Sequence, residues 1–314
     1  HQTRSDGMRM ILPPLVDPVG PNVDPILQSG LASLGSQMAA KLTAEGKDGI
    51  AVNVVYDSYS PSRSYPHYHG GIRVLSEAAS VRIASPVEIE YEQLKSDRGE
   101  RPTVTSWNHT MPWKGGKWTL RDIVEYDLSA AIACLDIAAR NRDTWVRNSF
   151  MVLRKNVSEQ CNHFAFVIPR EQHDPGATKE LVDILEFAAV EVHELQAVCS
   201  HEDVPMQPGD HVVFTNQPYG AFAQTMLETR RYPDIRQYPG GPPRYPYDAT
   251  AHSLPLKMGV EVRGISAPVH VKLRTLSGIN SRNETPDIPD FIAGRAYCIP
   301  PNSNHAARLV NRLL

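Results

Sequence analysis

The feature that most constrains this fold is an alternation of helical and β-type patterns along both halves of the chain. A helix is expected to begin at Asp24, whose side chain can cap it, with Pro25 at the first helical position. Apolar residues then recur at helical spacing as far as Leu42, and Gly46 ends the pattern. The β-branched run Ile50–Tyr56 follows and predicts a strand.

A second strand and a long helix complete the first half. Residues Ile72–Ser76 predict a strand that runs directly into Glu77, after a turn-rich loop rich in aromatic and histidine residues. Thr119 can cap a helix that continues to about Trp145. The apolar positions expected to face the core are Leu120, Ile123, Val124, Leu128, Ala131, Ile132 and Leu135.

The second half begins again with a strand–helix–strand pattern. Phe164–Ile168 predicts a strand, Asp174-Pro175 begins a helix through Phe187, and Val190–His193 predicts the next strand. A segment rich in proline and glycine, Tyr232–Pro255, is expected to be an extended surface loop. The sequence thus predicts an α/β protein of two domains, 1–155 and 156–314, the second flavodoxin- or amidotransferase-like.

Composition narrows the function classes. A chain of 314 residues suits two domains, and 41% hydrophobic residues can build a substantial core. No apolar run approaches the roughly 18 residues of a membrane span. The formal net charge of −3 lacks the basic excess typical of nucleic-acid surfaces. Neither a nucleic-acid partner nor a membrane span is expected.

The cysteines favour neither a metal knot nor a nucleophile. None of the four belongs to a C-x-x-C pair. In the second half, Cys161, Cys199 and Cys298 lack the small flanking residues of a strained strand-to-helix elbow. An amidotransferase-like activity there is therefore the weakest of the functions considered, and we expect the second half to be non-catalytic.

The local arrangement with most chemical content is Tyr56, a flexible loop, and then Glu77. A glutamate at a strand end among small residues can point into a cleft. A tyrosine on a mobile loop can swing onto a bound substrate and donate a hydrogen bond.

These residues carry a family resemblance. Four stretches of the first half and two of the second resemble a bacterial branch of the zinc carboxypeptidases, carboxypeptidase A-like metallopeptidases that often carry an accessory domain. The stretches are HQTRSDGMRMILPP (1–14), DPVGPNVDPIL (17–27), VVYDSYSPSRSYPHYHGGIRVLSEAAS (54–80), PWKGGKWTLRDIVEY (112–126), QPYGAFAQTMLE (217–228) and YPYDATAHSLPLKMGV (245–260).

The resemblance implies a role for each matching residue. His1 matches the third zinc ligand, Glu77 the general base, and Tyr56 the tyrosine of the substrate-covering loop. Ser62 or Arg63 falls near the base of the pocket for the terminal side chain. The expected activity is zinc-dependent release of C-terminal residues from a peptide or protein substrate, in an extracytoplasmic or secreted protein.

The departures from the family pattern concern the metal. The H-x-x-E motif with the other two zinc ligands should lie upstream of His1, as should the arginine and asparagine that bind the substrate carboxylate. Thr3, Arg4 and Asp6 also replace residues expected beside the third ligand. Because zinc affinity depends on ligand count and geometry, we expect the chain alone to be inactive and to need an N-terminal segment of the same protein.

Simpler interpretations stand beside these roles. Glu77 is expected to be either the base or a carboxylate that stabilises a strand end, and Tyr56 either a substrate contact or half-buried packing. Arg63 could select an acidic terminal side chain, but an exposed loop arginine is the commoner case. The pair His67 and His69 could belong to a metal site, but is more often part of a turn.

The rival hypothesis is a non-catalytic peptide- or glycan-binding protein on a carboxypeptidase scaffold. The segment Tyr232–Pro255 and the aromatics between Trp107 and Trp118 would form its binding surface.

Overall fold

The structure is a computed structural model that describes residues 2–96, 98–159, 161–202, 204–247, 251–276, 296, 298–299 and 301–313. It is a mixed α/β protein, as the sequence predicts. Contacts divide it into two compact units, His1–Val152 with Tyr232–Thr250, and Leu153–Arg231 with Ala251–Leu314. Most of the segment expected as a surface loop of the second half therefore packs with the first unit.

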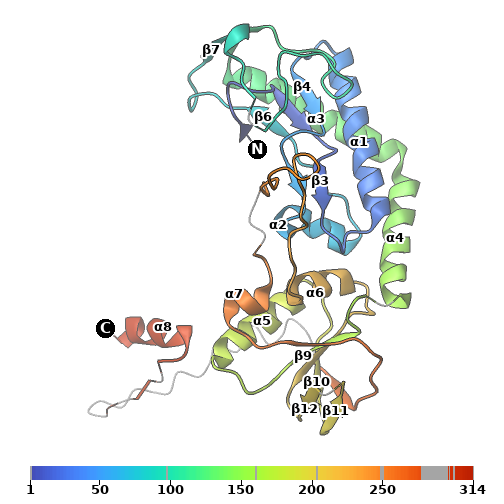
Figure 1. The fold of residues 1–314 in the computed structure, drawn as a ribbon, viewed down its shortest axis with the longest axis vertical. Coiled ribbons are helices and arrows are strands. Elements are labelled where there is room, and N and C mark those ends of the chain that lie inside the picture. Colours follow the sequence, from blue (N-terminus) through green and yellow to red (C-terminus); the bar gives the residue numbers. More distant parts are fainter. Residues whose placement is uncertain are drawn as a thin grey trace. The chain divides into compact units, whose positions relative to one another are not determined.

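The first unit is built on a four-stranded sheet in the order β1-β6-β2-β4. Its strands are β1 (Gln2–Thr3), β6 (Glu77–Ala79), β2 (Met10–Leu12) and β4 (Ile50–Val52). Strands β2 and β4 are parallel, joined through helix α1 (Pro25–Ala44), and β6 lies antiparallel to β2 (Figure 1). The α1 start is as predicted, because the Asp24 carboxylate accepts the N–H of Ile26 at 3.0 Å.

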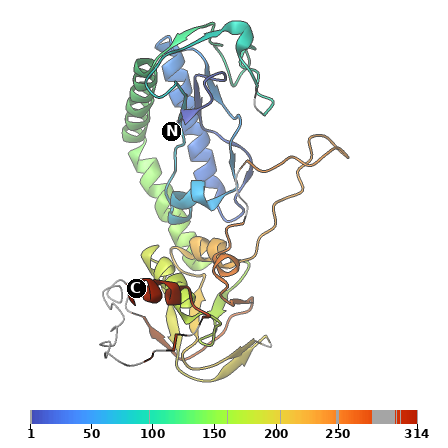
Figure 2. The same cartoon turned by 90° about the vertical axis from the view of Figure 1, so that its left-hand side faces the viewer.

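The two faces of this sheet have different partners, because side chains alternate along each strand. One face carries Met10, Leu12 and Ala78 and packs against α1 and α3 (Leu120–Arg140), which lie side by side (Figure 2). The other face carries Ile11 and Ala51, which cluster with residues of the loops that follow the strands. Glu77 pairs with Ile11 in register, so it belongs to this second face.

The strand expected at Ile72–Ser76 is displaced in the structure. Residues 72–76 form no regular element, and β6 begins at Glu77 itself. Glu77 is thus the first residue of its strand rather than the residue after it. The backbone N–H of Arg73 donates to the Nε2 of buried His67, so this segment bonds to a side chain instead of a neighbouring strand.

The long helix also differs from the prediction. It starts where expected, with Thr119 and Asp122 forming a reciprocal cap, but it ends at Arg140. A separate helix, α4 (Arg142–Ser158), follows and spans the division between the units. The expected core stripe is wrong for all its members except Ile123. The buried residues of α3 are Ile123, Tyr126, Ala130, Ala133 and Ile137.

The second unit has a five-stranded sheet in the order β14-β9-β13-β10-β15. The predicted strand and helix are present as β9 (Ala165–Ile168) and α5 (Pro175–Phe187). The next strand, expected at Val190–His193, is displaced to β10 (His193–Leu195) and shares only His193 with the prediction. Strands β9 and β10 both run antiparallel to β13 (His211–Phe214), which lies between them. Neighbouring described strands here are therefore antiparallel, unlike the parallel neighbours of a flavodoxin-like sheet.

Shorter elements complete the described chain. In the first unit they are β3 (Val16–Val19), β5 (Asp57–Ser58), α2 (Pro61–Ser64), η1 (Tyr65–His69), β7 (Val87–Glu90), η2 (Tyr91–Gln93) and β8 (Gly115–Trp118). In the second they are β11 (Cys199–His201), β12 (Val204–Met206), α6 (Gly220–Leu227), α7 (Leu254–Met258), β14 (Arg263–Ile265), β15 (Leu273–Thr275) and α8 (Asn304–Leu313).

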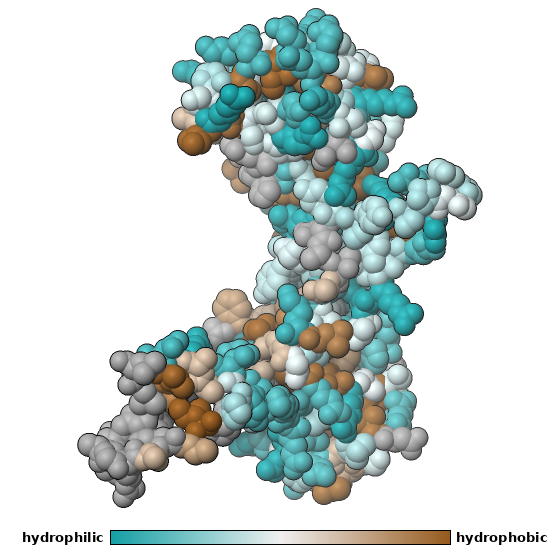
Figure 3. Space-filling model, turned by 60° about the vertical axis from the view of Figure 1, so that its left-hand side comes forward, coloured by the Kyte–Doolittle hydropathy of each residue, from teal (hydrophilic) through white to brown (hydrophobic). Residues whose placement is uncertain are grey.

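The surface in view is mainly hydrophilic, with apolar side chains in small separate groups (Figure 3). Among the helices in the described part of the chain, none has the length and apolar character needed to cross a membrane.

Candidate functional site

The candidate site centres on a contact between two buried residues, Tyr56 and Glu77. The Tyr56 hydroxyl donates a hydrogen bond to the Glu77 carboxylate. Only 2% of Tyr56 and 3% of Glu77 is exposed. The loop tyrosine expected to swing freely is thus packed against the glutamate that the sequence pairs with it.

A tight turn after β4 places Tyr56. Asn53 and Val55 have positive φ angles of 54° and 62°, a region that a β-branched residue such as Val55 rarely adopts. The turn redirects the chain, so that Tyr56 joins the cluster on the sheet face that carries Ile11. Strained backbone of this kind persists only where its surroundings hold it, and it concentrates at functional sites.

Burial sets the protonation chemistry of the pair. Desolvation raises the pKa of Glu77, while the hydrogen bond from Tyr56 and the charges of Arg63 and Arg73 oppose the rise. Desolvation, with the hydrogen bond to Glu77, holds the pKa of Tyr56 well above its ordinary value. Tyr56 is therefore a neutral hydrogen-bond donor, and Glu77 is a carboxyl group whose proton affinity has been increased.

Arg63 is held beside this pair by an acidic neighbour. Its guanidinium lies 3.0 Å from a carboxylate oxygen of Asp57, and the two side chains are 10% and 6% exposed. The expectation of an exposed loop arginine is therefore wrong. Arg63 lies within the single turn of α2, which begins at Pro61, and its guanidinium donates back to Asp57.

Residues 232–247, here called the strap, cover the same region. The N–H of Tyr247 donates to Asp57 at 3.0 Å, and the Tyr247 ring meets the Tyr56 ring edge-on at 4.6 Å. The Tyr232 ring packs edge-on against Tyr59 at 4.8 Å. A segment predicted as a surface loop of the second half is thus part of the candidate site.

Tyr247 also lies near two guanidinium groups. Arg63 is 4.7 Å and Arg98 is 4.6 Å from its ring centroid, distances typical of cation–π contacts. The arrangement joins the loop at Arg98, the strap and the Tyr56 loop into one packed region.

The two histidines of the H-x-H pair do not converge. His67 is buried, and burial lowers its pKa to about 4. The Nδ1 of His69 instead contacts the carbonyl of Tyr65, and its ring stacks on the Tyr65 ring at 4.4 Å. Both histidines belong to the 3₁₀ helix η1, in which residues two positions apart point in different directions. The two rings therefore do not form part of one metal-binding site.

The remaining predicted site residues are Ser62 and His1. Ser62 is exposed, and its hydroxyl shares a hydrogen bond of 2.8 Å with that of Ser60. His1 lies outside the described residues.

Zinc needs three protein ligands in a catalytic site. Among the described residues, no group of three histidine, cysteine, aspartate or glutamate side chains could hold a metal ion. Those residues by themselves do not fit a zinc site.

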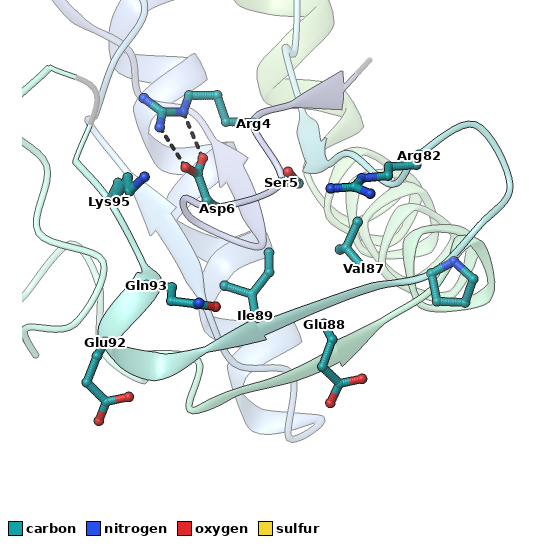
Figure 4. Close-up of a pocket in the computed structure, with 11 residues that line it drawn as sticks. Arg4, Ser5, Asp6, Arg82, Val87, Glu88, Ile89, Glu92, Gln93 and Lys95 are labelled. Atoms are coloured by element: carbon teal, nitrogen blue, oxygen red, sulfur yellow. Dashed lines mark hydrogen bonds and ion pairs between the residues drawn. The ribbon is translucent and has the colours of Figure 1, made fainter.

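An open cleft of the first unit lies elsewhere, with a volume of about 900 Å³ (Figure 4). Arg4 and Asp6 pair at one wall at 2.9 Å, and Glu88 and Glu92 turn away from them. Its basic and acidic lining residues are equally numerous, so the cleft has no charge preference. It does not include Tyr56 or Glu77.

Sequence reasoning missed Asp57, Arg73 and Tyr247. Asp57 could have been found from the sequence, since it directly follows Tyr56 and precedes the basic residue Arg63 in the same loop. Tyr247 had no such signal, because its contacts with Asp57 span 190 positions.

No family model, curated protein or solved structure matches this chain. The carboxypeptidase resemblance stays a hypothesis.

Proposed function

We propose that this chain contributes the proton-transfer residues of a metallocarboxypeptidase that hydrolyses C-terminal peptide bonds. The observation that supports this most is the buried hydrogen bond between Tyr56 and Glu77. A carboxyl group with a raised pKa beside a neutral phenol is a combination suited to proton transfer near neutral pH.

Each residue has a distinct role in the proposal. Glu77 accepts a proton from the attacking water and returns it to the leaving amine. Tyr56 moves from Glu77 to the substrate and donates a hydrogen bond to it. Arg63, already oriented by Asp57, faces the terminal side chain of the substrate and favours an acidic one. Ser62 would border the same pocket.

The metal is assigned to His1 together with ligands from a segment preceding it. Zinc, when bound there, would supply a Lewis acid. The proposal extends to the architecture. The first unit is the C-terminal part of a carboxypeptidase-like α/β/α domain, and the second unit is an accessory domain. The protein is extracytoplasmic.

The test is peptide hydrolysis by the chain extended with its natural preceding segment. Mass spectrometry of a synthetic peptide ending in glutamate should show release of that residue, and a chelator should stop it. Glu77→Gln should lower the rate by about 10²–10⁴-fold, the usual contribution of a general base. The matched control is Glu125→Gln, an exposed glutamate of α3 that pairs with Arg121. Full activity in Glu77→Gln would end the assignment.

The rival binding module has partial support. Trp107, Tyr238 and Tyr245 are 73%, 62% and 78% exposed and could stack on a peptide or glycan. Trp113 and Trp118, expected to be exposed, are buried instead. Binding of the same peptide without any hydrolysis by the extended chain would favour this alternative.

A further inference from the structure

A second cavity of the first unit, of about 320 Å³, lies next to the turn that precedes Tyr56. Asn53 and Val55, the two residues of that turn with positive φ, line it. The loop at Arg98 and the strap supply the opposite walls, through Arg98, Arg101 and Arg244. Three segments distant in sequence therefore meet around one hollow.

The charge of this cavity is unbalanced. Its lining includes three arginines and a single acidic residue, Glu100. The Glu100 carboxylate already accepts the backbone N–H of Arg98 at 2.7 Å. No ion pair joins any of the three arginines to a carboxylate within the described ranges. The larger cleft beside Arg4 has no such excess of positive charge, because its basic and acidic lining residues are equally numerous.

Neutral polar groups complete the lining. His109 is 2% exposed, and burial lowers the pKa of its ring. Asn108 is fixed, since its amide donates to the carbonyl of Val52 at 3.0 Å and its oxygen accepts from the Ser106 hydroxyl. The cavity therefore has a rigid, uncharged floor below a cationic rim.

The geometry points to a binding site for a compact oxyanion with two or more negative charges, such as a polycarboxylate or phosphate. Guanidinium groups bind carboxylate and phosphate oxygens in pairs of parallel hydrogen bonds. The arginines come from two different segments. A ligand that contacts both segments must therefore carry more than one anionic group, or several oxygens on one central atom. The volume suits a small anion rather than a polymer.

An anion at this site would act on the neighbouring pair through two contacts. It would pack against the strained turn at Asn53 and Val55, which leads directly into Tyr56. It would also hold Arg98 and Arg244, and Arg98 stacks on Tyr247. Ligand binding would thus order the strap. The binding site itself does not depend on the peptidase hypothesis.

The test is calorimetric titration of the whole chain with citrate and, separately, with inorganic phosphate at low ionic strength. At least one anion should bind with one site per chain, and the double variant Arg101→Gln/Arg244→Gln should weaken it at least tenfold. The matched control is Arg121→Gln/Arg140→Gln, which removes two exposed arginines of α3 and should change the affinity less than twofold.

A second readout locates the bound anion. A negative charge in the cavity should raise the pKa of His109, followed by NMR in wild-type protein with and without the anion. The double variant should lose this effect while keeping the wild-type circular dichroism spectrum. Absence of binding by both anions, equal weakening in the two double variants, or binding that leaves His109 unchanged would overturn the proposal.

Discussion

The backbone N–H of Tyr247 donates a hydrogen bond of 3.0 Å to the carboxylate of Asp57, across 190 positions of sequence. The other carboxylate oxygen of Asp57 accepts from Arg63 at 3.0 Å and from the N–H of Tyr59 at 3.2 Å. One nearly buried carboxylate therefore holds the strap, the arginine and the start of the loop that follows Tyr56. Its loss should affect all three together.

Asp57→Ala should destabilise the first unit by about 3–5 kcal/mol, because it leaves the Arg63 charge nearly buried without its anion. Urea unfolding followed by tryptophan fluorescence measures this unit alone, since Trp107, Trp113, Trp118 and Trp145 all precede residue 153. Trypsin should also cut faster after Arg236 and Arg244 in the released strap.

The matched control is Asp136→Ala. Asp136 pairs with Lys41 and Arg140, but its side chain is 31% exposed. Solvent screens such exposed pairs, so their loss costs far less stability than the loss of a buried pair. If the two alanine variants lost similar, small amounts of stability, Asp57 would not organise the site.

His67 should titrate with a pKa of about 4, because its buried ring is poorly solvated and Arg73 is close. The unfolded chain protonates this histidine near pH 6.5, so the folded state loses stability as the pH falls from about 6.5 to about 4. A shift of this size corresponds to roughly 3 kcal/mol at the acid end. Above pH 6.5 His67 should contribute no pH dependence.

NMR titration of the His67 ring measures the pKa directly. His67→Gln should reduce the slope of unfolding free energy against pH in the same window, whatever its effect on absolute stability. A His67 resonance that titrates near 6.5 would contradict the buried geometry.

Local chemistry in the sequence was enough to predict the α1 start and the α/β class. The side chain of Asp24 and the ring of Pro25 act within one turn, so no distant contact can alter them. The position of β6 was missed, because residues 72–76 have the β-branched composition of a strand but bond to His67 instead. Propensity does not reveal such a side-chain partner.

The strap was missed for a different reason. Its composition indicates a loop, which is correct, but composition carries no information on where a loop packs. The contacts of Tyr247 with Asp57 and Tyr56 depend on the tertiary fold. Arg63 was expected to be exposed for the same reason, since its burial depends on Asp57 and Tyr247 together.

Gly35→Ala should destabilise the first unit although alanine is the better helix former. A Cβ at position 35 would lie 2.0 Å from the carbonyl oxygen of Pro13, which is backbone and cannot rotate away. In an ordinary helix interior this change gains about 1 kcal/mol. Here we expect a loss of roughly 2–3 kcal/mol from overpacking, measured by urea unfolding.

Ser36→Ala is the control for this substitution, since Ser36 is the exposed neighbour of Gly35 on α1. It should gain about 0.5 kcal/mol from helix propensity. A gain in both variants would show that α1 can move away from Pro13.

Helix α3 provides the sharpest test of packing, because the apolar stripe expected from the sequence and the residues that are buried share only Ile123. It buries small residues such as Ala133 against the cluster shared with α1, which lets the two helices approach closely. Several of its larger aliphatic residues are exposed, at 41% for Leu120, 57% for Val124 and 58% for Leu128.

Two substitutions on α3 should therefore have effects opposite to those that the sequence pattern predicts. Leu128→Gln should change the free energy of unfolding by no more than about 0.5 kcal/mol, the usual effect of a surface change. Ala133→Leu should cost about 1–3 kcal/mol, because Ala133 is fully buried and the α1 contact leaves no space for the added atoms. Urea unfolding followed by tryptophan fluorescence distinguishes the two. A large loss for Leu128→Gln with none for Ala133→Leu would show that α3 presents its aliphatic face to the core.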